Sequence, residues 1–177
     1  MAGSLAVPVS DLDHVAGSLH APVVVVEYGD FECPICQSSE PAVKHLREMH
    51  GEKLAFVFRH YPLEDAHPNA LLAAEATEAA GAQGKFWEMH DLLLAPGRQL
   101  SRKHLDEYAA TLGLDLARFK AELDDDIYRQ RVREHQAGAQ ASHLRATPGF
   151  FVNGQLQDVS GGIHALFDRV ALVVSQS

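Results

Sequence analysis

The sequence predicts an α/β fold that is interrupted by an all-helical segment. A strand-helix-strand pattern occupies residues 22–60, and a hairpin pattern followed by a helix occupies residues 150–174. Between them, residues 68–145 hold helical patterns and no convincing strand. The chain has 177 residues, which is enough for one domain with a sizeable insertion, because domains commonly run to roughly 100–200 residues.

Four consecutive valines, Val23–Val26, mark the first strand, which we place at Pro22–Tyr28. An unbroken run of β-branched residues is typical of a strand that is buried on both faces. A helical pattern follows as far as His50. Pro34 suits its first turn, where the missing N–H is not needed.

The second strand is predicted at Lys53–His60, where Leu54, Phe56 and Phe58 share one face. Two strands joined by a helix over about forty residues imply a right-handed crossover. We therefore expect these strands to be parallel neighbours in one sheet.

Five helical patterns fill the middle of the chain, and glycines separate the first four of them. They cover Ala70–Ala80, Lys85–Leu94, Ser101–Leu112, Leu116–Leu123 and Ile127–Leu144. The first of them is rich in Ala, Leu and Glu, which are good helix formers. Ser101 is a candidate N-cap, with His104 at the position where a capping box prefers Glu or Gln.

The carboxyl end returns to strands. Phe150–Val152 and Gln155–Val159 flank Asn153-Gly154, the strongest short signal for a hairpin. A closing helix follows at Ile163–Val174, with its apolar residues on one stripe. The sequence thus predicts a central sheet of about four or five strands.

Composition and charge exclude some partners. The net charge is −9, with 15 basic and 24 acidic residues, so the molecule repels phosphate backbones and anionic lipid. The apolar run Val23–Val26 is far shorter than the roughly 18–20 residues of a membrane-spanning helix. Leu5–Val9 is too short for a signal peptide. We expect no nucleic-acid or membrane partner and a cytoplasmic location, or a periplasmic or secreted one if Met1–Ser4 replaces a leader.

The chain has only two cysteines, Cys33 and Cys36, and they lie where the first strand meets the helix. A thiolate attacks disulfides, and the unpaired N–H groups and dipole of a helix N-terminus favour a negative charge. We expect Cys33 to be acidic and solvent-accessible. Cys36, one turn further along, is shielded and able to resolve a mixed disulfide.

Two other interpretations of the cysteine pair stay open. Both could be buried structural residues, since free cysteine is among the most buried residue types. They could also be zinc ligands, but structural zinc normally takes four ligands and no second pair at such spacing is present. We expect no metal and no cofactor.

Several more side chains are candidates near the cysteines. Glu27 is the sole charge in the first strand and could accept a proton from the second cysteine, with its pKa raised by desolvation. A carboxylate at a solvated strand end is the competing interpretation of Glu27. His60 could donate to the site, although a structural histidine is the preferred interpretation. Phe31, Trp87 and Phe151 are expected in the core or at a cleft rim.

Several motifs, in this order, resemble the DsbA-like thioredoxin-domain family over nearly the whole chain. They are Val26–Cys36 with its Cys33-Pro34-Ile35-Cys36 sequence, Phe58–Leu63, His67-Pro68, Gly84–Trp87 and Thr147–Gly154.

The resemblance implies a thioredoxin fold, residues 1–66 and 146–177, interrupted by a helical domain, residues 67–145. It implies that Cys33 is the nucleophile and Cys36 the resolving cysteine. It also implies that Thr147-Pro148 is a cis-proline pair opposite the active site, which offers the preceding backbone to the substrate. X–Pro bonds are the ones for which cis is inexpensive.

The expected function is therefore disulfide exchange with protein substrates, supported by a redox recycling partner. The catalytic set is Cys33, Cys36, Glu27 and Pro148, and the substrate-binding set is Pro34, Ile35, Thr147 and Phe31. Strongly oxidising family members carry His where this chain has Ile35, so reduction or isomerisation are also open. A glutathione-dependent kappa-class-like transferase or isomerase is a competing function, which the intact Cys36 disfavours. A non-enzymatic module that pairs with a transporter or chaperone is another.

Overall fold

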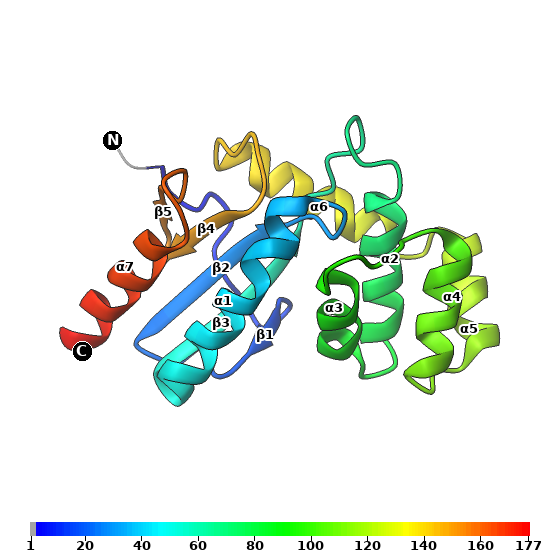
Figure 1. The fold of residues 1–177 in the computed structure, drawn as a ribbon, viewed down its shortest axis with the longest axis horizontal. Helices are drawn as coiled ribbons and strands as arrows, with labels where there is room; N and C mark the ends of the chain where they lie inside the picture. The colour runs from blue at the N-terminus through cyan, green and yellow to red at the C-terminus, as the bar shows by residue number, and fades with distance from the viewer. Residues whose placement is uncertain (1–2) are drawn as a thin grey trace. The chain divides into compact units, whose positions relative to one another are not determined.

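A computed structural model describes residues 3–177 of the chain (Figure 1). Its strands are β1 (His14–Ala16), β2 (Val23–Gly29), β3 (Leu54–His60), β4 (Gly149–Val152) and β5 (Gln155–Gln157). Its α-helices are α1 (Pro34–His50), α2 (Ala70–Gly81), α3 (Phe86–Leu94), α4 (Arg102–Thr111), α5 (Leu116–Asp124), α6 (Arg129–Ala141) and α7 (His164–Ser175). A short 3-10 helix, η1, covers Gly51–Lys53.

The chain forms two compact units. The first, the sheet unit, comprises the chain up to Gly29, Ser39–Arg59 and Ala137–Ser177. The second, the helical unit, comprises Asp30–Ser38 and His60–Gln136. Helices α1 and α6 each continue from one unit into the other. The segment with both cysteines therefore belongs to the helical unit.

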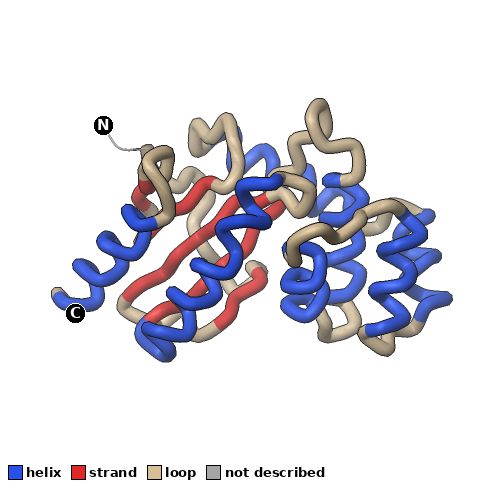
Figure 2. Tube along the Cα trace, viewed as in Figure 1, coloured by secondary structure: helices blue, strands red, loops and turns tan. Residues whose placement is uncertain are grey.

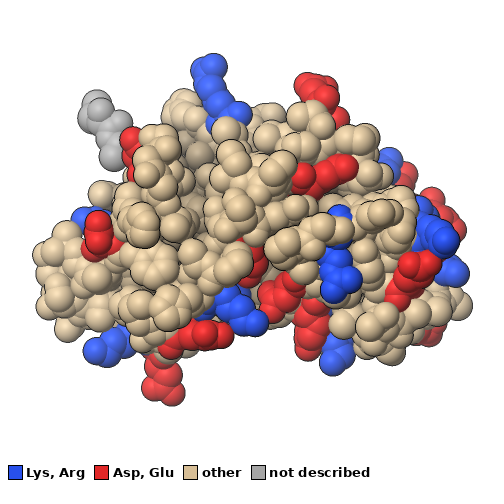
Figure 3. All heavy atoms as spheres, viewed as in Figure 1, with Lys and Arg blue, Asp and Glu red and all other residues tan. Residues whose placement is uncertain are grey.

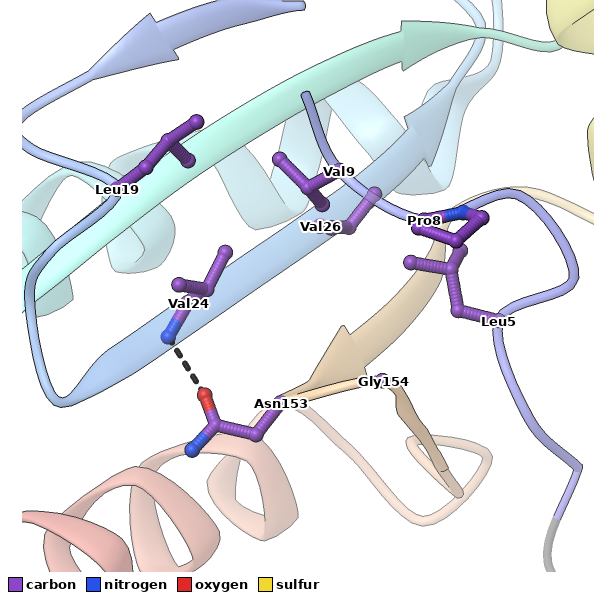
Figure 4. Close-up of a pocket in the computed structure, with 8 residues that line it drawn as sticks. All are labelled: Leu5, Pro8, Val9, Leu19, Val24, Val26, Asn153 and Gly154. Atoms are coloured by element: carbon purple, nitrogen blue, oxygen red, sulfur yellow. Dashed lines mark hydrogen bonds between the residues drawn. The ribbon is translucent and has the colours of Figure 1, made fainter. Parts of the chain in front are cut away.

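The five strands form one mixed sheet in the order β1-β3-β2-β4-β5. β1 is antiparallel to β3, β4 to β2, and β5 to β4. The central strands β2 and β3 are neighbours and run in the same direction, as the strand-helix-strand pattern predicts (Figure 4). The predicted fold class is confirmed.

Strand β1 is the element that the sequence analysis missed. It has three residues, all of intermediate burial, and it pairs His14 with Phe58 and Ala16 with Phe56. A strand this short carries almost no alternation of its own. It exists because distant residues of β3 offer it hydrogen-bond partners.

The two faces of the sheet are covered differently. Helix α1 runs along one face, where it buries Val43 and Leu46, and α7 packs on β2 and β4 (Figures 1 and 4). The N-terminal segment with Pro8 and Val9 lies over the other face (Figure 4). The predicted helix Ile163–Val174 agrees with α7 to within one residue at each end.

Helix α2 is the centre of the helical unit and packs against α3, α4 and α5 (Figure 2). Its buried residues are mostly alanines: Ala70, Ala73, Ala74, Ala76, Ala79 and Ala80. Small side chains let neighbouring helices approach closely. As predicted, no strand lies between Ala70 and Ala141 in the described chain.

The helix boundaries differ from the prediction mainly at α6, which was expected at Ile127–Leu144. It begins at Arg129 and ends at Ala141, and His143, inside the expected range, has a left-handed φ angle of 61° that a helix does not accommodate. Ser101 is the N-cap of α4, as predicted, but its hydroxyl bonds His104 Nδ1 at 2.6 Å and not the backbone. Of the helices in residues 3–177, none is long and apolar enough to cross a bilayer.

Candidate active site

The two cysteines lie at the start of α1. Cys33 directly precedes Pro34, its N–H donates to the carbonyl of Asp30 at 3.1 Å, and its own carbonyl accepts from Gln37 N at 3.1 Å. The two side chains are not joined in a disulfide. The exposed fraction is 5% for Cys33 and 1% for Cys36. Cys36 is shielded, as expected, whereas Cys33, which was expected to be solvent-accessible, is buried as well.

The residues between and before the cysteines divide into exposed and buried ones. Pro34 and Ile35 are exposed, Ile35 to 61%, so both present surface to a substrate. Phe31 is only 1% exposed, and its ring packs against the rings of His60 and His90 with centroids 6.0 and 5.9 Å away. Phe31 is therefore a core residue in this structure and offers no surface for the substrate contact expected of it.

Two carboxylates precede Cys33, and a second loop of the helical unit binds both. Asp30 accepts through Oδ2 from Leu63 N at 2.9 Å and pairs with His67 Nδ1 at 2.7 Å. Glu32 accepts from the backbone N and the side-chain Nδ2 of Asn69 at 2.7 and 3.1 Å. Polar contacts with this loop thus fix the segment before Cys33. The sequence analysis did not predict these contacts, although the His67-Pro68 motif was a signal for them.

The pKa of His67 is shifted from its ordinary value. Burial alone would lower the pKa of His67, but the hydrogen bond and charge of Asp30, together with the charges of Cys33 and Glu32, raise it above its ordinary value. Its side chain is 18% exposed, whereas that of Asp30 is fully buried. The Asp30 carboxylate therefore shifts His67 towards its imidazolium form.

His60 fits the structural interpretation. It is fully buried, its Nε2 lies 2.8 Å from Glu78 Oε1, and its backbone N donates to His135 Nδ1 at 3.1 Å. Ligand atoms of His60, Glu78 and His135 lie within 4.8 Å of one another, close enough to hold a metal ion. However, Arg131 Nε lies 3.0 Å from Glu78 Oε2. A cation already occupies this carboxylate, so the cluster is better described as a buried charge network.

Glu27 and the predicted cis-proline belong to the sheet unit. Glu27 lies in β2 opposite Phe150 of β4 and is 1% exposed, so it is not a carboxylate at a solvated strand end. The peptide bond between Thr147 and Pro148 is cis and immediately precedes β4. Thr147 is buried and Pro148 is half-buried.

The sheet unit also contains an apolar pocket of about 410 Å³ (Figure 4). Its lining consists of Leu5, Pro8, Val9, Leu19, Val24, Val26, Asn153 and Gly154. Asn153 Oδ1 accepts from Val24 N at 2.7 Å, so its amide is used by the hairpin turn. The lining contains neither a cysteine nor a titratable side chain, so this pocket does not carry the exchange chemistry.

A family model described as thioredoxin matches residues 10–165, a range that includes both cysteines and the cis-proline. The chain belongs to the thioredoxin family. Oxidised BdbD from Bacillus subtilis superposes with a TM-score of 0.85 at 21% identity, covering 98% of this chain and 97% of that one. A thioredoxin-like oxidoreductase from Silicibacter pomeroyi DSS-3 superposes with 0.81 at 23% identity, covering 95% of each. At these identities the likeness establishes a DsbA-like thioredoxin fold.

Curated relatives are more similar in sequence but much longer. A protein named Na(+)/H(+) antiporter NhaA 1 from Salinispora arenicola is 52% identical over 163 residues, which cover 92% of this chain and 25% of that protein. A protein of the same name from Mycolicibacterium vanbaalenii is 44% identical over 150 residues, covering 81% of this chain and 24% of that protein. The chain thus spans about a quarter of these relatives.

Proposed function

We propose that this thioredoxin-family chain exchanges disulfides with protein substrates through Cys33 and Cys36. The observation that carries the proposal is a pair of thiols at the start of α1, in a DsbA-like fold. The exposed Pro34 and Ile35 provide a surface beside the thiols on which a substrate chain can lie.

In the oxidising direction, a substrate thiolate attacks Sγ of Cys33 in the Cys33–Cys36 disulfide. That bond breaks, a mixed disulfide forms, and Cys36 leaves and takes up a proton. A second substrate thiolate then attacks the substrate sulfur of the mixed disulfide, and Cys33 leaves as a thiolate. Two electrons pass from the substrate to the protein, and the reverse sequence reduces a substrate disulfide.

Two supporting roles complete the proposal. We propose that Glu27 accepts and returns the proton of Cys36. The cis Thr147-Pro148 pair would offer the backbone of Thr147 to the extended substrate. In this proposal, residues 1–66 and 146–177 form the thioredoxin-fold domain, and residues 67–145 form the inserted helical domain.

Trapping of the intermediate tests the proposal. Cys36→Ser leaves the nucleophile without a resolving thiol, so incubation with a disulfide-bonded peptide should accumulate a mixed disulfide that mass spectrometry detects. Cys33→Ser is the matched control and should accumulate none. Wild-type protein should reach a measurable dithiol–disulfide equilibrium in glutathione buffers. A wild type that neither oxidises nor reduces a peptide, with no mixed disulfide from Cys36→Ser, would overturn the function.

The antiporter relatives favour a second role for the same domain. We infer that the exchange reaction acts on, or responds to, a Na(+)/H(+) antiporter, because a segment about half identical to this chain forms about a quarter of proteins with that name. In this role, transport itself would belong to the remaining part of such a protein or to a partner.

A hybrid protein tests this role. The matching quarter of the Salinispora arenicola protein is replaced by this chain, and sodium-dependent proton exchange is measured in membrane vesicles under dithiol and disulfide conditions. We expect exchange to depend on the redox state, and we expect that dependence to disappear when Cys33→Ser and Cys36→Ser are combined. Equal exchange under both conditions would contradict the role.

A further inference from the structure

The charges around Cys33 are unusual for a nucleophilic thiol. Asp30 and Glu32 place two carboxylates within three residues of it, and the segment Asp30–Ser38 contains no Lys, Arg or His. Negative charges at this distance disfavour a thiolate. The N-terminus of α1 favours a thiolate at Cys33, and a positive charge from another part of the chain would offset the two carboxylates.

The loop Tyr61–Asn69, which binds the segment before Cys33, supplies a positive charge. Its only basic residue is His67. We propose that His67, held by Asp30, is the positive charge that stabilises the Cys33 thiolate in this chain. The inference rests on the proposed exchange function and adds a positioning residue to it.

The geometry fixes this imidazole tightly. His67 Nδ1 lies 2.7 Å from Asp30 Oδ2, and the same oxygen accepts from Leu63 N at 2.9 Å. The backbone carbonyl of Asp30 in turn accepts from Cys33 N at 3.1 Å. Asp30 therefore binds the imidazole of His67 through its side chain and the backbone of Cys33 through its carbonyl. An imidazolium has two N–H donors, so the bond to Asp30 leaves one more for the site.

The other acidic groups near His67 are bound by their own partners or lie in solvent. Glu32 is bound by both nitrogen donors of Asn69, and Glu64, in the same loop, forms an ion pair with Arg133. Asp65, also in this loop, is exposed. Asp30 and His67 form a pair of zero net charge. Loss of His67 would therefore leave the Asp30 carboxylate uncompensated beside Cys33.

The electrostatic coupling is reciprocal. The charge of Cys33 is among the interactions that raise the pKa of His67, so the imidazolium must favour the Cys33 thiolate by the same interaction free energy. In the exchange reaction, this interaction acts when Cys33 leaves the mixed disulfide as a thiolate. It stabilises the dithiol form of the protein relative to the disulfide form and makes the protein a stronger oxidant.

His67→Gln tests the inference. The pKa of Cys33 is measured from the thiolate absorbance of the reduced protein, and the equilibrium constant with glutathione is measured by alkylation and mass spectrometry. We expect the Cys33 pKa to rise by about one unit, which is about a tenfold loss of thiolate below that pKa. The glutathione equilibrium should shift towards the protein disulfide by a similar factor. His67→Lys should restore both values in part, and His20→Gln, at an exposed histidine, should change neither.

A measurement on the wild type covers the case in which His67→Gln does not fold. The pKa of His67, followed by NMR, should be higher in the dithiol form than in the disulfide form. Equal His67 pKa values in the two forms, or an unchanged Cys33 pKa in a folded His67→Gln, would overturn the inference and leave the exchange function standing. A wild type without any exchange would instead overturn the function itself.

Discussion

We propose that single residues around the two cysteines set the pKa of Cys33. Ile35 is 61% exposed and offers neither a charge nor a hydrogen bond, whereas His67 is ion-paired to a fully buried carboxylate. Cys33 and Cys36 are both buried. In our proposal, the redox properties of this site depend on His67, which follows Cys33 in the chain only after the whole of α1 and β3.

The first prediction for a single residue concerns the reduction potential. Because Ile35 cannot stabilise the thiolate, we expect a potential between those of thioredoxin and DsbA, about −270 to −120 mV, and nearer to thioredoxin. Ile35→His should make it less negative, since a stabilised thiolate stabilises the reduced form. The measurement is equilibration of both proteins in glutathione buffers. An unchanged or more negative potential in Ile35→His would show that this side chain does not control it.

The second prediction for a single residue concerns His67 and the pH dependence of the unfolding free energy. The folded-state pKa of His67 is raised, so its stabilising contribution is complete below its unfolded pKa of about 6.5 and is lost as pH rises through the folded value. The difference in unfolding free energy between wild type and His67→Gln should therefore be larger at about pH 5.5 than at about pH 9. Denaturant titrations of the reduced proteins measure it. A difference that grows with pH would contradict the sign.

Among the secondary-structure elements, close packing of β2 against β3 sets the end of β2 just before the dithiol segment. Gly29 is the last residue of β2, and a Cβ placed on it would lie 2.5 Å from Cε2 of Phe58 in β3. The ring of Phe58 is fully buried and has no room to move away. A glycine at the end of β2 is therefore required by packing.

We predict from this packing that Gly29→Ala destabilises the protein by about 1–3 kcal/mol, the usual cost of overpacking a core. Gly161→Ala is the matched control, because a Cβ there has no atom within 4 Å. It should change the unfolding free energy by less than about 0.5 kcal/mol. Thermal or denaturant unfolding compares the two. Equal effects in both variants would mean that the Phe58 contact is relieved at little cost.

At the scale of the whole molecule, a buried ion pair joins distant segments of the chain. Arg59 of β3 binds Asp13 through Nε and Nη2 at 2.8 and 2.9 Å and donates to the carbonyls of Val7 and Pro8. Both charged side chains are nearly buried, at 4% and 6% exposure. On the face drawn in Figure 3, basic side chains lie among acidic ones and form no continuous basic surface, in agreement with the net charge of −9.

We predict that Arg59→Met costs about 3–5 kcal/mol, because it leaves the Asp13 carboxylate buried without its cation. Arg145→Met, at an exposed arginine, is the control and should cost little. Asp13→Asn and the double variant complete a cycle whose coupling energy isolates the pair. A coupling energy near zero in unfolding experiments would show that the N-terminal segment does not depend on this ion pair.

Local signals in the sequence were sufficient for the elements that contain those signals. The run of valines predicts β2, the Asn-Gly turn predicts the hairpin of β4 and β5, and the alanine-rich stretch predicts α2, because each signal lies within the residues that form the element. The position of the cysteine pair, after a strand and before a helix, was predicted in the same way. The fold class and the candidate nucleophile follow from these patterns together.

Contacts between distant parts of the chain needed the tertiary structure. Strand β1 exists through pairing with β3, and the burial of Cys33, Phe31 and Glu27 depends on what packs around them. The pairing of Asp30 with His67 joins residues 37 positions apart. No local pattern specifies such a contact, because hydrogen bonds and desolvation act between groups that only folding brings together.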